Sequence, residues 1–413
     1  MREMKDSGIE WAGVIPNTWN INKGKYFMEL LTRPTLETDE VITCFRDGEV
    51  TLRSKRREEG FTVSLTEAGY QGIEIGDLVV HGMDGFAGSI GISDSRGKAT
   101  PVLNVLDTEQ NKRYMMYLMR TMAYCELFLS LATGIRVRTC DTNWKKLREI
   151  DYILPTIPEQ KAIADFLDEQ CAEIDSLISD IQSQIEALEE YKRSVITEAV
   201  TKGLEPDVEM RDSGVQWIGM MPTHWDCQRG KYLLRYVQKP VRDDDGVITC
   251  FRDGEVTLRS NRREEGFTMA DKEIGYQGID VGDLVVHGMD GFAGSIGISD
   301  SRGKASPVLN VLDTEQNKRY IMYYLRSMAY NDVFVALATG IRVRSCDLRW
   351  NKLAELLYPM PPVEEQQAIV EHIDSVLERT NAIIADKKQQ IETIEEYKKS
   401  LIFEYVTGKK EVA

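Results

Sequence analysis

The sequence predicts an α+β fold in which two mixed α/β domains, related by a pseudo-two-fold axis, are joined by two long antiparallel helices that form a coiled coil. Three observations support this prediction. The chain of 413 residues repeats itself at a constant offset of 206. The first part of each half combines glycine with short β-branched runs. The last part of each half is a long stretch with helical periodicity.

The repeat is visible in long identical segments. VITCFRDGEVTLRS begins at Val41 and again at Val247, and GDLVVHGMDGFAGSIGISDSRGKA begins at Gly76 and again at Gly282. Over the 104 positions that start at Val41, 83 are identical to those that start at Val247. This period is longer than that of the common solenoid repeats, so each half is predicted to be a domain-sized unit.

Residues 1–155 and 207–361 are predicted to be the two mixed domains. Runs such as VITCF, DLVVHG, SIGIS and GIRVR indicate short strands, and one helix is expected from about Lys112 to Leu131. The glycine-dense segment 82–93 lacks the GxGxxG spacing of a nucleotide loop. Tight turns between strands are therefore favoured, with glycines that let the backbone approach a neighbouring strand or a phosphate.

Residues 156–206 and 362–413 are predicted to be the two helical regions. No glycine or proline occurs from Glu159 to Val200, and apolar residues recur there at spacings of three, four or seven, which predicts one stripe along a helix. The stripe consists of Ile163, Leu167, Ile174, Ile178, Ile181, Ile185, Leu188, Val195 and Ala199. An equivalent stripe follows Glu364.

The direction of the helices follows from the order of the chain. Because the first helix carries the chain to the second domain, the second helix must run back to lie beside the first. We therefore expect an antiparallel pair, about 60 Å long at ~1.5 Å per residue. Such a pair has a two-fold axis perpendicular to it, and duplex DNA has an axis of the same kind.

The net charge of −16 argues at first against a nucleic-acid partner, but the charge is unevenly distributed. Residues 1–155 and 207–361 each carry 20 basic and 22 acidic side chains. Residues 156–206 carry 4 basic and 12 acidic side chains, and residues 362–413 carry 7 and 11. The negative charge is thus concentrated on the helices, and each domain can present a basic face.

Basic residues cluster at equivalent places in both domains, and arginine binds phosphates as a fork or reads guanine in the major groove. In GIRVR, two arginines share one face of a predicted strand. The alternative is a solvated surface with local ion pairs, because Asp47, Glu58 and Glu59 lie among these residues. The candidate DNA-binding residues are Arg46, Arg53, Lys55, Arg56, Arg57, Arg96, Lys98, Arg136 and Arg138 in the first half, and Arg252, Arg259, Arg262, Arg263, Arg302, Lys304, Arg342 and Arg344 in the second.

Two further pairs of residues recur between the halves. His81 is followed at three residues by Asp84, and His287 by Asp290. A metal site would need more ligands, so a structural or base-edge hydrogen bond is favoured. The tryptophan pairs that open each domain are predicted to be packing anchors rather than base-stacking platforms; these are Trp11 with Trp19 and Trp217 with Trp225.

The composition also bears on the compartment. The seven cysteines form no CxxC pair, the first twenty residues lack the apolar core of a signal peptide, and no stretch approaches ~18 consecutive apolar residues. We therefore expect a cytoplasmic chain with free thiols. The cysteines that recur between the halves are predicted to be buried in the cores; they are Cys44, Cys140, Cys250 and Cys346.

The junctions between domains and helices carry a family resemblance. IPEQKAIADFLDEQ and VEEQQAIVEHIDSV, the endings EEYKRSVITEAVTKGL and EEYKKSLIFEYVTGKK, and the openings DSGIEWAGVIPNTWN and DSGVQWIGMMPTHWD resemble the conserved regions of type I restriction-modification specificity subunits. The resemblance covers nearly all of the chain, because both copies of each segment occur in the right order.

The resemblance implies a DNA-recognition subunit without catalysis or a cofactor of its own. Two target recognition domains would each bind half of a bipartite DNA site, and the helices would set the spacing and dock two methyltransferase subunits. Those subunits would bring S-adenosylmethionine and methylate adenine, and restriction subunits would join the complex. Because the halves share most of their sequence, an interrupted palindrome is the expected target.

The sequence itself is consistent with a lack of catalysis. It contains no Asn-Pro-Pro-aromatic motif of adenine methyltransferases, no GxxxxGK[ST] loop and no paired-cysteine zinc pattern. Two alternatives remain open. One is a coiled-coil scaffold that carries two ligand-binding domains, and the other is a self-contained nuclease or methyltransferase that uses His81 and Asp84.

Overall fold

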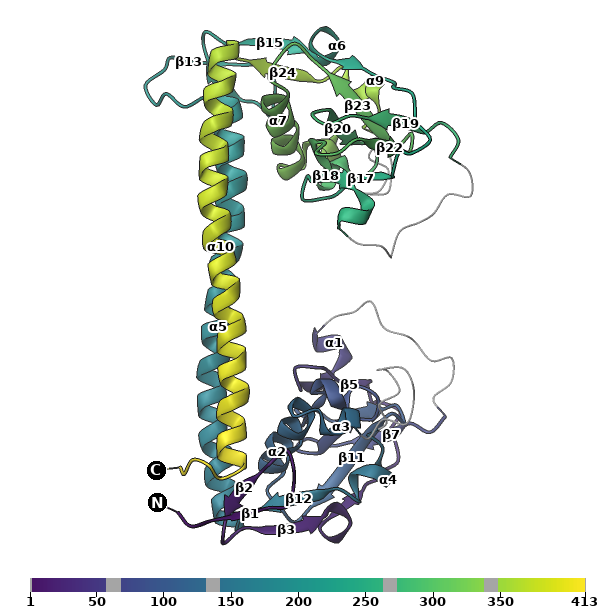
Figure 1. Ribbon diagram of the computed structural model, residues 1–413, viewed down its shortest axis with the longest axis vertical. Coiled ribbons are helices and arrows are strands. Elements are labelled where there is room, and N and C mark those ends of the chain that lie inside the picture. Colours follow the sequence, from purple (N-terminus) through teal and green to yellow (C-terminus); the bar gives the residue numbers. More distant parts are fainter. Residues whose placement is uncertain (1, 57–67, 131–141, 263–272, 338–347, 413) are drawn as a thin grey trace. The chain divides into compact units, whose positions relative to one another are not determined.

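The computed structural model describes residues 2–56, 68–130, 142–262, 273–337 and 348–412. The chain divides into two compact units. Unit 1 comprises residues 1–181 and 388–413, and unit 2 comprises residues 182–387. Each unit contains one globular domain and a part of each long helix, α5 (Ile157–Lys202) and α10 (Val363–Val406) (Figure 1).

The core of unit 1 is a four-stranded antiparallel sheet in the order β4-β11-β8-β9. Two-stranded pairs surround it: β1 with β2, β3 with β12, β5 with β6, and β7 with β10. The strands are β1 (Met4–Asp6), β2 (Val14–Pro16), β3 (Asn20–Lys23), β4 (Met28–Leu30), β5 (Ile42–Cys44), β6 (Val50–Leu52), β7 (Gln71–Ile73), β8 (Leu78–His81), β9 (Ile90–Ile92), β10 (Gly97–Ala99), β11 (Leu103–Thr108) and β12 (Asp151–Leu154). The helices before α5 are α1 (Arg53–Arg56), α2 (Lys112–Tyr124), α3 (Leu127–Ser130) and α4 (Trp144–Leu147).

Strand β8 is buried on both faces, which explains its uninterrupted apolar run. Leu78 and Val80 lie in the cluster that includes the apolar residues of α2. Val79, between them, lies in the cluster formed with β5, β6 and β7. Side chains alternate across a strand, so a strand covered on both faces needs an apolar residue at every position.

Helix α2 is shorter than the sequence predicts. The side chain of Asn111 caps its start by accepting hydrogen bonds from the amides of Arg113 and Tyr114. The predicted helix to Leu131 is wrong at its end, because α2 stops at Tyr124. Glu126 then adopts a left-handed conformation with φ 58°, which interrupts the i to i−4 hydrogen-bond ladder, and α3 follows as a separate turn.

Unit 2 repeats this topology, with the sheet order β16-β23-β20-β21. Its strands are β13 (Met210–Asp212), β14 (Met220–Pro222), β15 (Asp226–Arg229), β16 (Arg235–Tyr236), β17 (Ile248–Cys250), β18 (Val256–Leu258), β19 (Gln277–Ile279), β20 (Leu284–His287), β21 (Ile296–Ile298), β22 (Gly303–Ala305), β23 (Leu309–Asp313) and β24 (Leu357–Met360). Its helices before α10 are α6 (Gly230–Leu233), α7 (Lys318–Tyr330), α8 (Val333–Ala336) and α9 (Trp350–Leu353).

The helix segments within unit 1 run antiparallel. The ring centroids of Phe166 and Tyr405 lie 4.4 Å apart, and Nζ of Lys398 lies 2.6 Å from a carboxylate oxygen of Asp175. Moving forward along α5 therefore means moving backward along α10. The predicted antiparallel pairing is confirmed here.

In unit 2, contacts between the later part of α5 and the earlier part of α10 also show an antiparallel arrangement. Lys387 donates to the side chain of Gln184 at 2.5 Å, and Gly203, at the end of α5, lies against the carboxylate of Glu365, at the start of α10. The direction of α10 relative to α5 is thus antiparallel within this unit as well.

The predicted apolar stripe of α5 is largely buried. Ile163, Leu167, Ile174, Ile181, Ile185 and Ala199 are buried, and Ile178, Leu188 and Val195 are half-buried. Near the end of the helix, Ile196 rather than Val195 takes the fully buried position. The shift by one residue arises because a 3.6-residue period drifts against a strict seven-residue spacing.

The predictions for tryptophan and cysteine are confirmed where the structure describes them. Trp19 and Trp225 are fully buried packing residues, and Cys44 and Cys250 are buried in the cores. Cys140 and Cys346 lie outside the described residues. None of the helices in the described residues combines the length and the hydropathy that a membrane-spanning segment requires.

Candidate nucleic-acid interface

A braced hairpin positions the first basic cluster. Strands β5 and β6 are joined by a tight turn that contains Gly48 at φ +86°. From α2, Arg120 reaches this turn and donates to the carbonyls of Ile90 at 2.8 Å and Asp47 at 2.5 Å. At this φ a residue with a Cβ would be strained, and its Cβ would also displace the Arg120 guanidinium, which together account for the glycine. The role of Arg120 could not be predicted from the sequence, because no local pattern links this residue to a turn 73 residues away.

Glycines also let the backbone segments of this region approach each other. Gly91 of β9 lies so close to the Gly48 carbonyl that a Cβ there would be 1.9 Å from the oxygen. The interpretation of segment 82–93 as turns between closely packed strands is thereby confirmed.

Arg56 is tied into the hairpin by three groups. Its guanidinium lies 4.1 Å from the ring centroid of Phe45, pairs with Asp47 and donates to Glu49 at 2.9 Å. Burial alone would raise the pKa of Asp47, but hydrogen bonds from Arg56 and from the Glu49 amide lower it. Arg262 repeats these contacts with Phe251, Asp253 and Glu255 in unit 2; they are local ion pairs that compensate much of the arginine charge.

Arg46 differs from Arg56 in its exposure. Its side chain is 65% exposed, and it makes one ion pair, from Nη2 to Asp84 Oδ1 at 2.9 Å. Arg252 is 67% exposed and pairs with Asp290 at 3.1 Å. These two residues are the most accessible arginines of the predicted clusters within the described chain.

The remaining residues of the first cluster contact neighbouring segments. Arg53 donates from Nε to the Thr43 hydroxyl at 3.3 Å, and Arg259 does the same to Thr249. Lys55 donates to the Ser95 hydroxyl at 2.7 Å, which brings α1 beside the segment that precedes Arg96. In unit 2, Asn261 replaces Lys55 and donates to Thr257 at 2.9 Å.

Arg96 and Arg302 are engaged by nearly buried carboxylates. Arg96 holds Asp39, whose side chain is 2% exposed, and also pairs with Glu74. Arg302 holds Asp245 and pairs with Asp280. These contacts favour the ion-pair alternative for both arginines, and their DNA-binding role stays a prediction.

The lysines that follow them on the same strands also stay predictions as DNA ligands. Lys98 lies on β10, and Lys304, its equivalent on β22, donates to Glu273 at 2.7 Å. Six further candidates lie outside the described residues, and they are Arg57, Arg136, Arg138, Arg263, Arg342 and Arg344.

The carboxylate network of unit 2 should make its stability depend on pH. Hydrogen bonds from Lys239 and Arg302 lower the pKa of Asp280 to about 2, from 3.8. A depressed pKa adds stability that is present above the ordinary pKa and lost as the pH falls through the lowered one. We expect the urea concentration at which unit 2 is half unfolded to decrease as the pH falls from about 4 to about 2. Asp280→Asn should make this decrease smaller.

The measurement is urea unfolding of the full chain across this pH range, followed by hydrogen exchange of peptides from unit 2. Asp243→Asn, at an exposed aspartate of the same unit, is the control and should keep the wild-type pH dependence. Equal pH dependence in both variants would contradict the assignment.

A hollow of about 460 Å³ lies beside the hairpin of unit 1 and is lined by Phe45, Arg46, Arg56, His81, Asp84 and Ser89, among others. The Ser89 hydroxyl is buried without a hydrogen-bond partner among the described residues, and so is that of Ser295 at the equivalent place in unit 2. A buried hydroxyl without a partner costs free energy, and both units carry this cost at the equivalent position.

His81 has a structural role in the wall of this hollow. Its Nδ1 accepts hydrogen bonds from the amides of Met83 at 3.2 Å and Asp84 at 3.0 Å. Burial lowers the pKa of His81, which favours the neutral ring. Because Nδ1 accepts hydrogen bonds, the proton of the neutral ring lies on Nε2. The predicted structural hydrogen bond is confirmed, and the described residues contain no group of three or more potential metal ligands.

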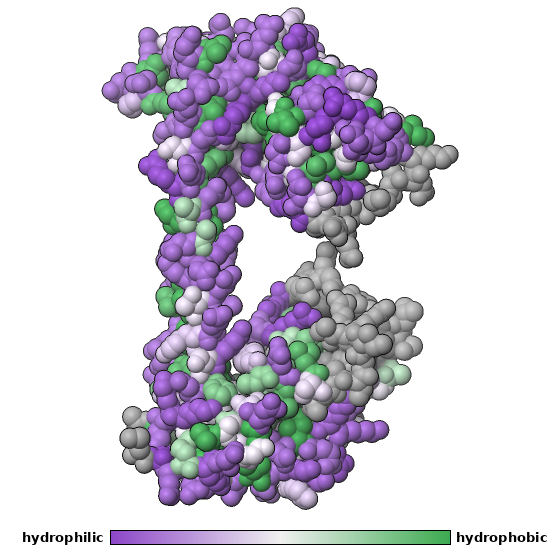
Figure 2. Space-filling model, in the orientation of Figure 1, coloured by the Kyte–Doolittle hydropathy of each residue, from purple (hydrophilic) through white to green (hydrophobic). Residues whose placement is uncertain are grey.

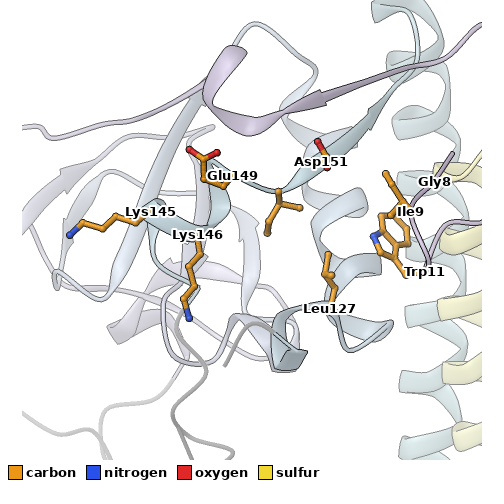
Figure 3. A pocket seen from close by; sticks show the side chains of 9 residues that line it. Gly8, Ile9, Trp11, Leu127, Lys145, Lys146, Glu149 and Asp151 are labelled. Carbon is orange, nitrogen blue, oxygen red and sulfur yellow. The ribbon is translucent and has the colours of Figure 1, made fainter. Parts of the chain in front are cut away.

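A second hollow in unit 1 is lined by Ile9, Trp11, Leu127 and Lys146, among others, and shares no residue with the first (Figure 3). The indole N–H of Trp11 has no partner among the described residues. In unit 2, the equivalent Trp217 donates to the Tyr324 hydroxyl at 3.1 Å, but Leu118 stands at that place in unit 1. The unpaired donor is thus explained by a substitution in the core.

In each unit, a buried glutamine that is not among the sequence-predicted residues joins the long helix to the domain. Gln160 is fully buried; its Oε1 accepts from the Asn111 amide at 2.9 Å, and its Nε2 donates to Gln110 at 2.7 Å and to the Pro155 carbonyl at 3.0 Å. Gln366 repeats all three bonds in unit 2. The sequence does carry a signal for this glutamine, because Gln160 is polar but lies at the helical spacing of the buried apolar stripe.

Each domain also contacts the end of the other long helix. The Tyr114 hydroxyl lies 3.0 Å from the carbonyl of Ile153 and 3.2 Å from that of Val406, at the end of α10. In unit 2, the Tyr320 hydroxyl lies 3.2 Å from the carbonyl of Val200, near the end of α5. The two domains thus make the same contact with exchanged helices.

Comparisons with known proteins agree with this architecture, although no family model matches the sequence. The chain is 24% identical over 322 residues to a putative type I restriction enzyme MjaX specificity subunit of Methanocaldococcus jannaschii, with 74% of this chain and 71% of that protein covered. It is 26% identical over 326 residues to the type I restriction enzyme MjaVIII specificity subunit of the same organism, with 73% and 72% covered.

The fold also matches a solved structure from work on the assembly and conformational transition of the type I restriction-modification system. The TM-score is 0.66 at 11% identity, and the match covers 95% of this chain and 98% of that chain. The predicted resemblance and the predicted fold class are thereby confirmed.

Proposed function

We propose that this chain is the DNA-recognition subunit of a type I restriction-modification complex, in which residues 1–155 and 207–361 are target recognition domains. One observation carries the proposal. Two equivalent domains present the same arginine-bearing hairpin, and each is anchored to the start of its own long helix and to the end of the other. The similarity to two specificity subunits over about three quarters of the chain supports it.

The exchange of helix ends supports a bipartite DNA target. It is the pattern that a two-fold axis between the domains would produce, and duplex DNA offers a matching axis between two inverted half-sites. Each domain would read one half-site, and the helices would fix the number of unread base pairs between them. Basic residues of the hairpins would contact phosphates and base edges.

The chemistry would come from partner subunits. Two methyltransferase subunits, which bring S-adenosylmethionine, would dock on the helices and methylate adenine, and restriction subunits would join this complex. On the face drawn in Figure 2, α5 and α10 are mainly hydrophilic with scattered apolar residues, which favours polar docking contacts. This chain would contribute no catalytic group and no cofactor.

The proposal is tested by expressing the full chain with a type I methyltransferase subunit. We expect the two to co-purify, the complex to bind S-adenosylmethionine, and the methylated adenines to fall in one bipartite sequence. The chain alone should bind no S-adenosylmethionine.

Two results would contradict the proposal. Binding of S-adenosylmethionine or DNA cleavage by the isolated chain would favour the enzyme alternative. A co-purified complex that methylates without sequence preference would favour a scaffold.

A further inference from the structure

We propose that Arg46 and Arg252 are the guanine-reading residues of the two domains, each held in place by a carboxylate, Asp84 or Asp290. This inference rests on the proposed function and adds to it the residues and the base on which specificity depends. It follows from asking which arginines of the repeated hairpins still have donors to offer a ligand.

Neighbouring arginines are already engaged. Arg56 is shared between two carboxylates and the ring of Phe45. Arg96 is shared between two carboxylates, and its side chain is only 30% exposed. Arg46 is 65% exposed and has one carboxylate partner.

The contact of Arg46 leaves most of its guanidinium available. Nη2 donates to Asp84, and among the described residues neither Nε nor Nη1 has a hydrogen-bond partner. A guanidinium carries five N–H groups, and bidentate recognition of guanine O6 and N7 uses two of them. Because the carboxylate already restricts the side chain, less rotamer freedom is lost when the base binds.

The backbone that carries this carboxylate is held by the hydrogen bonds of its turn. The Asp84 amide donates to His81 Nδ1 at 3.0 Å, and the Asp84 carbonyl accepts from the Ala87 amide at 2.9 Å. The equivalent bonds of Asp290 are 2.9 Å each. His81 therefore acts as a positioning residue for Asp84.

The hollow beside Arg46 suits a base edge better than a phosphate. Its charged side chains are two arginines, Arg46 and Arg56, and two aspartates, Asp47 and Asp84, so the formal charges cancel. A hollow without net positive charge gives a phosphate little net attraction, whereas a neutral base edge needs donors and acceptors side by side.

The test exploits the two equivalent domains of one molecule. Arg46→Lys keeps the positive charge but removes the planar fork, and the assembled methyltransferase complex is then selected on randomised duplexes. We expect preference for guanine at one position of one half-site to fall by about 10- to 100-fold. The other half-site should be unchanged, which shows that the complex is folded.

Arg252→Lys should likewise relax the guanine preference in one half-site only, and the double variant with Arg46→Lys should relax it in both. Arg229→Lys is a matched control, because Arg229 is 53% exposed and pairs with a single carboxylate, Glu355, outside the hairpin. It should leave every base preference unchanged.

Two results would overturn the inference. One is wild-type preference at every position in Arg46→Lys, and the other is equal weakening on all sequences, which identifies a phosphate contact. Failure of the proposed function would look different, because the unmodified complex would then select no sequence.

Discussion

Replacing Gln160 with leucine is expected to destabilise unit 1 by about 3 kcal/mol or more. The substitution leaves the buried Pro155 carbonyl and the partly buried Asn111 amide without their side-chain partner. Each such group costs about 1–3 kcal/mol. Because Asn111 also caps α2, the loss weakens the joint between that helix, strand β12 and α5 at once.

Hydrogen exchange of the full chain measures this effect by unit. Peptides of unit 1 should exchange faster in Gln160→Leu, and those of residues 207–361 should keep their wild-type protection. Gln366→Leu should reverse the pattern, because it makes the same bonds in unit 2. Gln182→Leu, at an exposed position of the same helix, is the control. Unchanged protection in Gln160→Leu would show that these hydrogen bonds contribute little.

The repeat and the helices could be predicted because their signals are local and periodic. Apolar residues at spacings of three and four specify one helix face. Chain order alone then gives the antiparallel direction that the contacts of Phe166 with Tyr405 and of Gln184 with Lys387 confirm within each unit. The end of α2 was harder, since a left-handed Glu126 has no clear sequence signature.

Which arginines are already engaged in ion pairs within the domain could not be predicted from the sequence. Arg96 is engaged by Asp39, 57 residues earlier, whereas Arg46 is left exposed beside Asp84. These pairings are set by the sheet that brings distant segments together. The sequence therefore identifies the basic clusters. Only the folded chain separates the arginines whose N–H groups remain available to a ligand from those that stabilise the domain.

The preferred DNA target is expected to be an interrupted palindrome, bound at least about 100-fold more tightly than the same half-sites in direct orientation. The hairpin contacts of Arg46 and Arg252 are the same in both domains, so the two domains should read the same bases. Under the proposed two-fold relation, these readers face opposite strands. Reversing one half-site would mismatch several base pairs, each at a cost of about 1–3 kcal/mol.

This expectation applies to the surface residues that the two halves share, because the halves differ at other positions. Within residues 121–130 and 327–336, Thr121 and Ser327 are buried and cannot touch a base, whereas Glu126 and Asp332 differ at an exposed position. Residues 61–67, where the halves also differ, lie outside the described chain. Selection of randomised duplexes by the assembled complex, at fixed salt, should therefore return two matching inverted half-sites around an unread spacer. Unrelated half-sites would assign the reading to the segments that differ, and a direct repeat would exclude the two-fold relation between the domains.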